Sequence, residues 1–268
     1  MDGMPQESAN MTGIPVEVAH LIMDHLELMD LCHLSCVDVL SFQRISEYYH
    51  HNLSIRRILL PFFPREDDFA LFRELQRTHD VLVSASQALS IFNRTVYQNS
   101  DLDLYVQQWH RQYLVTVLER AGYTRHGSLR PPSLRASVIR WQQSRDGDSM
   151  TFFDDRSHIL TRSEYSDKSI ADVEEFRNGL GAVMQIITCH GPPLDVVLGF
   201  HSSCVMNVVA YDYTYCLYPK ATLVHKVSIV RIGDDGNAIR AQNKYSDRGY
   251  RLVYRNTSTL NIDLRDQP

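Results

Sequence analysis

The chain has 268 residues, of which 44% are hydrophobic and 22% charged, as in an ordinary soluble globular protein. The net charge of -5 argues against a broad nucleic-acid-binding surface, and no apolar run approaches the roughly 20 residues of a membrane span. The first twelve residues lack a signal-peptide pattern, and we expect them to be disordered. Five scattered cysteines indicate reduced thiols. We therefore expect a cytoplasmic or nuclear protein without a membrane partner.

Residues 13–64 are predicted to form a small module of two or three amphipathic helices. Apolar residues such as Ile22 and Leu26 recur at helical spacing after Pro15, which suits a first helical turn. Asp30 is predicted to cap the N-terminus of a second helix. Prolines and an acidic run near residue 65 predict a domain boundary there.

The same region resembles the F-box. The residues that carry the resemblance are Ile14-Pro15-x-Glu17-Val18, Ile22, Leu26, Asp30-Leu31, Leu34 and Val37. The resemblance implies docking on the adaptor subunit of a cullin-type ubiquitin ligase through an apolar helical surface. Where the family usually has a basic-aromatic position, this chain has Asp38-Val39-Leu40. A helical hairpin packed on the main domain is the alternative.

Residues 65–268 are predicted to form an α+β domain, a mixed twisted sheet with flanking helices. Helices and strands are expected to alternate through the first half of this domain. Helices are expected at 69–80, 86–96, 106–123 and 194–200, strands at 81–83, 101–106, 182–189 and 201–210, and short strand-like pieces between 136 and 162.

Asp101 and Asp103 lie one residue apart in the predicted strand at 101–106. Residues i and i+2 of a strand point to the same face, about 6–7 Å apart. Two carboxylates placed in this way can converge on Mg²⁺ and a phosphate-bearing group. A solvent-facing strand edge is the alternative interpretation.

Motifs in a fixed order resemble divergent fungal and viral-type nucleotidyltransferases of the polymerase-beta-like fold. They are the turn Ser84-Ala85-Ser86, the pair Asp101-x-Asp103, Pro193 through Phe200, Leu217-Tyr218-Pro219, and Lys244-Tyr245-x-x-Arg248-Gly249-Tyr250. The resemblance implies that Asp101 and Asp103 hold Mg²⁺ against a nucleoside triphosphate. It also implies that Ser84, Ser86 and Arg248 contact the nucleotide, although Arg248 also suits a helix C-terminus.

Two positions depart from that family pattern. Ala85 replaces a glycine whose bare backbone would approach the phosphates, and alanine disfavours positive φ. The third carboxylate of the family is expected on a later strand, where this chain offers Phe200-His201. Neutral imidazole is a poor Mg²⁺ ligand, although His201 can serve as a general base.

Three hypotheses follow from these residues. The domain is a degenerate nucleotidyltransferase, a pseudoenzyme that binds a nucleotide and Mg²⁺; or it is an active NMP transferase using Asp101, Asp103 and His201. The third hypothesis is an F-box-type substrate receptor that uses the degenerate domain as an interaction surface.

Overall fold

The computed structural model describes residues 13–97, 100–128, 169–230 and 243–254. The N-terminal twelve residues and the strand-like pieces predicted between 136 and 162 lie outside the described residues. The described part combines helices with a mixed sheet, as the predicted α+β class requires. None of its helices combines the length and the apolar character needed to cross a bilayer.

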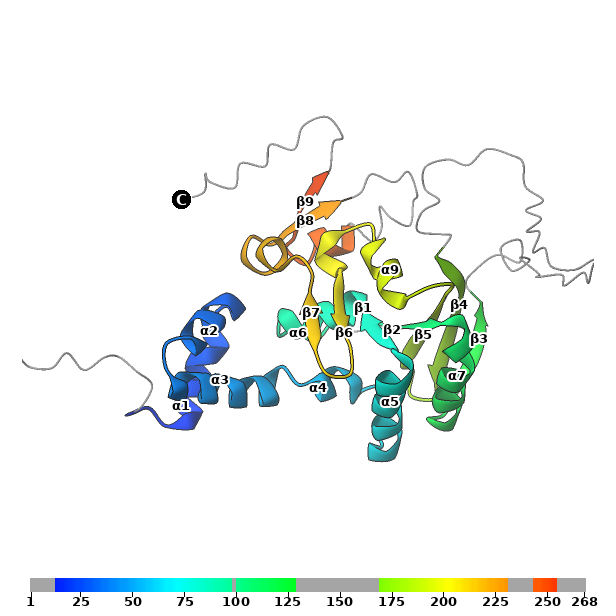
Figure 1. Ribbon diagram of the computed structural model, residues 1–268, viewed down its shortest axis with the longest axis horizontal. Coiled ribbons are helices and arrows are strands. Elements are labelled where there is room, and N and C mark those ends of the chain that lie inside the picture. Colours follow the sequence, from blue (N-terminus) through cyan, green and yellow to red (C-terminus); the bar gives the residue numbers. More distant parts are fainter. Residues whose placement is uncertain (1–12, 98–99, 129–168, 231–242, 255–268) are drawn as a thin grey trace, which may run out of the picture.

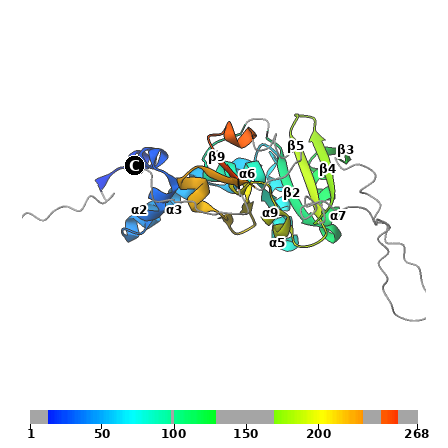
Figure 2. The ribbon, with the colours of Figure 1, turned by 90° about the horizontal axis from the view of Figure 1, so that it is seen from above.

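Of the four N-terminal helices, the first three lie at one end of the molecule, whereas the fourth lies beneath the sheet and packs into the core of the main domain (Figures 1 and 2). The Asp38 carboxylate accepts a hydrogen bond from the Ser41 backbone N–H at 2.7 Å and caps the third helix. A second cap, Ser54, splits the last predicted segment into two helices. Their bounds are α1 Val16–His25, α2 Leu28–Ser35, α3 Val39–Asn52 and α4 Ile55–Leu59.

The prediction that Asp30 caps the second helix is wrong. The N-cap is Glu27, three residues before Asp30, and the helix begins at Leu28 after the extended residues Leu26 and Glu27. Asp30 therefore lies within the first turn, where a carboxylate favours the positive end of the helix dipole. The module encloses a small core of its own, formed by Ala19, Met23, Leu31, Ile45 and Tyr48.

A seven-stranded mixed sheet forms the centre of the main domain, in the order β3-β4-β5-β2-β1-β6-β7. Only β2 and β5 run parallel; the other neighbours are antiparallel. A separate parallel pair joins β8 to β9. The bounds are β1 Leu82–Ser84, β2 Leu102–Gln107, β3 Tyr123–Ser128, β4 Ile170–Asn178, β5 Val183–Cys189, β6 Asn207–Val209, β7 Thr214–Cys216, β8 Val227–Val230 and β9 Arg251–Tyr254.

The two faces of the sheet are covered differently (Figure 1). Leu102 and Leu104 are fully buried with residues of α5 (Glu66–His79) and α7 (Arg111–Arg120). On the opposite face, Tyr105 packs with residues of α9 (Pro193–Leu198). The aspartates that alternate with these leucines therefore lie on the α9 face, beyond the end of its apolar cover.

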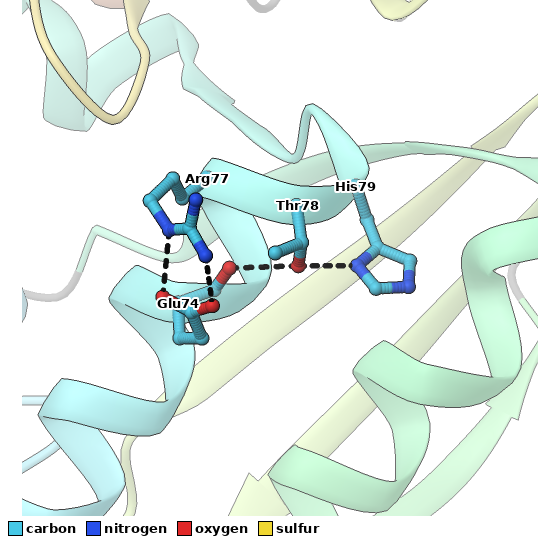
Figure 3. Close-up of polar contacts among 4 residues, drawn as sticks. All are labelled: Glu74, Arg77, Thr78 and His79. Carbon is cyan, nitrogen blue, oxygen red and sulfur yellow. Dashed lines mark hydrogen bonds and ion pairs between the residues drawn. The ribbon is translucent and has the colours of Figure 1, made fainter.

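Ion pairs of two kinds support the domain. At the end of α5, Glu74 pairs with Arg77 in solvent, and the Thr78 hydroxyl donates to the Glu74 carbonyl (Figure 3). Glu174 of β4 is instead fully buried and pairs with both Arg111 and Arg125. Because only the second kind compensates a buried charge, only that kind is expected to matter for stability.

The predicted strand at 201–210 is wrong over its first half. The chain forms the one-turn helix η4 (Ser203–Val205) there, and β6 begins only at Asn207. The Ser203 hydroxyl accepts from the Ile229 N–H at 2.9 Å, and the Asn207 amide donates to the Cys204 carbonyl at 2.7 Å. These side-chain bonds give the backbone an alternative to a strand ladder.

Candidate functional site

Antiparallel pairing of β1 with β2 brings the serine turn beside the aspartate pair. Val83 lies opposite Leu104, so the end of β1 lies next to the start of β2. The turn at residues 84–86 and the two aspartates therefore lie at the same edge of the sheet. The sequence predicted both parts, and their proximity follows from the strand register.

Ala85 adopts a left-handed backbone, with φ of +58°. This region favours glycine and costs an alanine about 1 kcal/mol or more. The turn between β1 and α6 (Ala85–Phe92) thus keeps a backbone suited to glycine although the residue has changed. Because alanine disfavours positive φ, Ala85 is a strained position. The replacement of glycine has not changed the conformation of the turn.

The two serines of the turn have different partners. Ser84 is fully buried and donates its hydroxyl to the Asn207 carbonyl at 2.5 Å, which ties β1 to β6. Ser86 accepts from the Arg248 guanidinium at 3.1 Å, and its Oγ lies 3.1 Å from the Tyr245 hydroxyl. Only Ser86 is therefore linked to a cation that can contact an anionic ligand.

Arg248 lies on aromatic rings beside this turn. Its guanidinium carbon is 3.7 Å from the ring centre of Tyr97 and 5.2 Å from that of Tyr245. Stacking of this kind holds a guanidinium in place without neutralising it. In the described part of the chain no carboxylate forms an ion pair with Arg248.

The two aspartates are both harder to ionise than usual. Burial, with a contribution from the Asp101 charge, raises the pKa of Asp103 to about 7, while Lys244 opposes the shift. Burial also raises the pKa of Asp101, and Lys244 again opposes it. Burial lowers the pKa of Lys244. Lys244 is therefore a second cation of the site, after Arg248. It lowers the pKa of both aspartates without a direct ion pair to either of them among the described residues.

Gln185 of β5 occupies the position beside Asp103 in the sheet. The two residues are partners in the parallel register of β2 and β5, and Gln185 donates to Asp101 Oδ2 at 3.2 Å. The next residue across, Glu175 of β4, forms an ion pair with Arg177 at 2.5 Å. An amide, and not a third carboxylate, therefore stands next to the aspartate pair.

His201 lies apart from the strand that pairs with β2. It precedes η4, and its ring centre is 6.5 Å from that of Tyr245. Its Nε2 is buried without a hydrogen-bond partner, and burial lowers the pKa of the imidazole. No described hydrogen bond joins His201 to Asp101 or Asp103, and its neighbour in the site is an aromatic ring.

The donor set allows a limited fit to Mg²⁺. Asp101 and Asp103 offer two hard oxygen ligands on one face, and Mg²⁺ commonly binds one or two carboxylates together with substrate phosphates and water. Over the residues the structure describes, His, Cys, Asp and Glu side chains form no group of three or more suited to a metal ion. The chain therefore fits one Mg²⁺ shared with a phosphate better than a complete protein-built site.

Sequence reasoning missed Gln185 and Lys244 as site residues. Gln185 interrupts an apolar strand, which is a signal of a special environment. Lys244 precedes Arg248 by four residues, the spacing of one helical turn. No protein-family model matches this chain, and no curated protein or solved structure is significantly similar to it.

Proposed function

We propose that the main domain binds a nucleoside triphosphate with Mg²⁺ but does not transfer its nucleotidyl group. The observation that carries the proposal is the gathering of three distant segments at one sheet edge. Ser86 follows β1, Asp101 directly precedes β2 and Asp103 lies at its start, and Arg248 donates to Ser86 from the C-terminal part. In this arrangement Arg248 and Lys244 contact phosphate oxygens, and the aspartates share one Mg²⁺ with them.

We infer that the domain does not transfer the nucleotidyl group because no third carboxylate stands directly beside Asp101 and Asp103 to act as the base. In-line transfer to a hydroxyl needs a group that accepts its proton. The Gln185 amide beside Asp103 cannot accept a proton, and Glu175 is held by Arg177. His201 lies next to Tyr245 and makes no hydrogen bond with either aspartate.

Binding is tested by calorimetric titration of the full chain with ATP in the presence of Mg²⁺. Arg248→Met keeps much of the side-chain stem but removes the cation, and we expect it to weaken binding at least about tenfold. Arg251→Met is the matched control, because Arg251 is an exposed cation on β9 outside the site. Equal affinities of both variants and the unmodified chain would contradict the proposed phosphate contact.

Transfer is tested by incubating the chain with radiolabelled ATP, Mg²⁺ and protein, RNA or small hydroxyl acceptors. We expect no labelled product. Label transfer that disappears in Asp101→Asn would show an active transferase and overturn the second half of the proposal.

A second candidate function is supported by the N-terminal module. Its helices expose apolar side chains that a soluble surface does not need, including Leu21 at 61%, Val39 at 73% and Phe42 at 59% exposure. Exposed apolar side chains on a helical module are suited to docking on another helical protein. This favours the F-box-type hypothesis, in which the module binds the adaptor of a cullin-type ubiquitin ligase.

The docking hypothesis is tested with the purified adaptor and the full chain. Leu21→Asp combined with Phe42→Asp should abolish the complex on size-exclusion chromatography. Leu194→Asp, an exposed leucine in α9, is the matched control and should leave it intact. If neither the unmodified chain nor the control binds the adaptor, the hypothesis is refuted.

A further inference from the structure

A pair of histidines lies at the end of β2 opposite the candidate site. Asp101 directly precedes β2, whereas His110 ends the short helix η2 (Gln108–His110) that follows the same strand. The length of β2, six residues, separates the two places by about 20 Å. His79 is the last residue of α5, and its ring centre is 4.6 Å from that of His110. The proposed nucleotide site uses neither histidine.

The hydrogen bonds at the end of α5 place the free lone pair of His79 on Nε2. A hydroxyl has one proton, and that of Thr78 goes to the Glu74 carbonyl at 2.8 Å. The Thr78 oxygen can therefore only accept from His79 Nδ1, which lies 2.6 Å away (Figure 3). In the neutral ring the proton is thus on Nδ1 and the lone pair on Nε2. Histidines that bind metal ions are held by a bond of this kind from their other ring nitrogen.

His110 supplies a second nitrogen. Its Nδ1 is buried and has no hydrogen-bond partner among the described residues. A buried nitrogen without a partner needs an explanation, of which a bound ion is one. The Tyr113 ring centre lies 4.6 Å from that of His79 and 6.3 Å from that of His110, and the Trp109 ring centre lies 6.3 Å from that of His110. These aromatic neighbours limit the rotation of both imidazoles.

The separation of the two rings matches that of two imidazoles on one metal ion. A nitrogen ligand lies about 2.0–2.1 Å from the metal, which places the centre of its ring about 3 Å from the metal. Two imidazoles at a right angle then have ring centres about 4.5 Å apart, and two at the tetrahedral angle about 5 Å. A coordinated ion lies in the plane of each imidazole, and the two ring planes, which cross at 87°, share a line on which it can lie. The observed 4.6 Å fits the right angle of square-planar or octahedral coordination.

We propose that His79 Nε2 and His110 Nδ1 bind one divalent transition-metal ion, with water at the remaining positions. Imidazole suits such ions, and Cu²⁺ and Ni²⁺ prefer right-angled coordination by nitrogen and oxygen. Water is required because the described residues form no group of three protein ligands. The negative charge of Asp80, which acts on the His79 ring, also favours a cation there. The ion joins the end of α5 to the segment after β2, and this site does not depend on the proposed nucleotide binding.

A Cu²⁺ titration of the full chain tests the site, with the fluorescence of Trp109 as the local readout. Trp141→Phe leaves Trp109 as the only tryptophan, and a Cu²⁺ ion beside His110 quenches its fluorescence. In this background His79→Gln and His110→Gln should each weaken the Cu²⁺ affinity at least about tenfold. His33→Gln, at an exposed histidine of α2, is the matched control and should leave the affinity unchanged. Unchanged affinity in either of the first two variants, or quenching that does not saturate, would overturn the inference.

A second pair of variants tests the lone pair assigned to His79 without removing a ligand. Thr78→Val deletes the acceptor of the Nδ1 proton from an exposed position, and we expect about tenfold weaker Cu²⁺ binding. Thr116→Val is the matched control, because the Thr116 hydroxyl makes the same kind of bond in α7, to the Gln112 carbonyl at 3.0 Å, with no histidine bonded to it. Equal Cu²⁺ affinities of the two variants would overturn ligation through His79 Nε2.

Discussion

Asp103→Asn should make the folded protein more stable at pH 8. Burial raises the pKa of Asp103 from 3.8 to about 7. The folded state therefore holds this proton more tightly than the unfolded state, and the free energy of unfolding falls as the pH rises from 3.8 through 7. Three pKa units at 1.36 kcal/mol each give a ceiling of about 4 kcal/mol above pH 7. Asparagine cannot ionise, so the variant avoids this cost.

Urea unfolding at pH 5 and pH 8, followed by circular dichroism, measures the effect. The variant should exceed the unmodified chain by about 2–4 kcal/mol at pH 8 and by much less at pH 5. Mg²⁺ should restore part of the stability of the unmodified chain at pH 8 but not that of the variant. A difference that does not change between the two pH values would refute the assignment of a desolvated carboxyl at Asp103.

Three further changes test other parts of the structure. Glu174→Gln leaves Arg111 and Arg125 without their buried partner and should cost about 3 kcal/mol in urea unfolding, whereas Glu74→Gln, in the exposed pair of Figure 3, should not change the midpoint measurably. Ala85→Gly relieves a positive φ and should stabilise the protein by about 1 kcal/mol, raising its unfolding temperature by about 2–4 °C; a lower temperature would refute the strain. Arg94→Met removes hydrogen bonds to the Met23 and Leu26 carbonyls and should speed amide exchange in α1 but not in α7.

The parts predicted well from sequence are those whose partners are near in the chain. The order helix, strand, helix, strand over α5, β1, α6 and β2 follows from local periodicity and turn residues, and the structure confirms it. The proximity of Ser86 to Asp103 follows because β1 and β2 are consecutive and antiparallel. The serine turn and the aspartate pair can therefore be predicted from the sequence, because the strands that carry them are consecutive.

The identity of the residue beside Asp103 could not be predicted, because it is set by a pairing between strands that are distant in the sequence. Gln185 meets Asp103 because β5 adds in parallel to β2, and no local pattern specifies which strand lies there. The family spacing pointed instead to His201, which precedes η4, a segment held by a local side-chain bond from Asn207 and by a bond from Ile229 of β8. Strand register across distant segments is not encoded in a motif.

Strand β4 was missed for a different reason. Its sequence places Glu174 and Glu175 side by side, so neither face shows an apolar alternation. Glu174 is nevertheless buried, because Arg111 and Arg125 neutralise it from α7 and β3. A charge that is buried with its partners looks like a surface residue until the partners are known.

The two candidate functions are physically connected through α4. Ile58 of α4 and Phe62 just after it line a cavity of about 380 Å³ that reaches Asp101 of the candidate site, and this segment is also the end of the N-terminal module. Arg94, next to α6, donates to the Met23 carbonyl in the same module. A ligand in this cavity would therefore contact both parts of the chain. Any shift of α4 that an adaptor causes must change nucleotide affinity by the factor by which the nucleotide changes adaptor affinity, since the two binding free energies are linked.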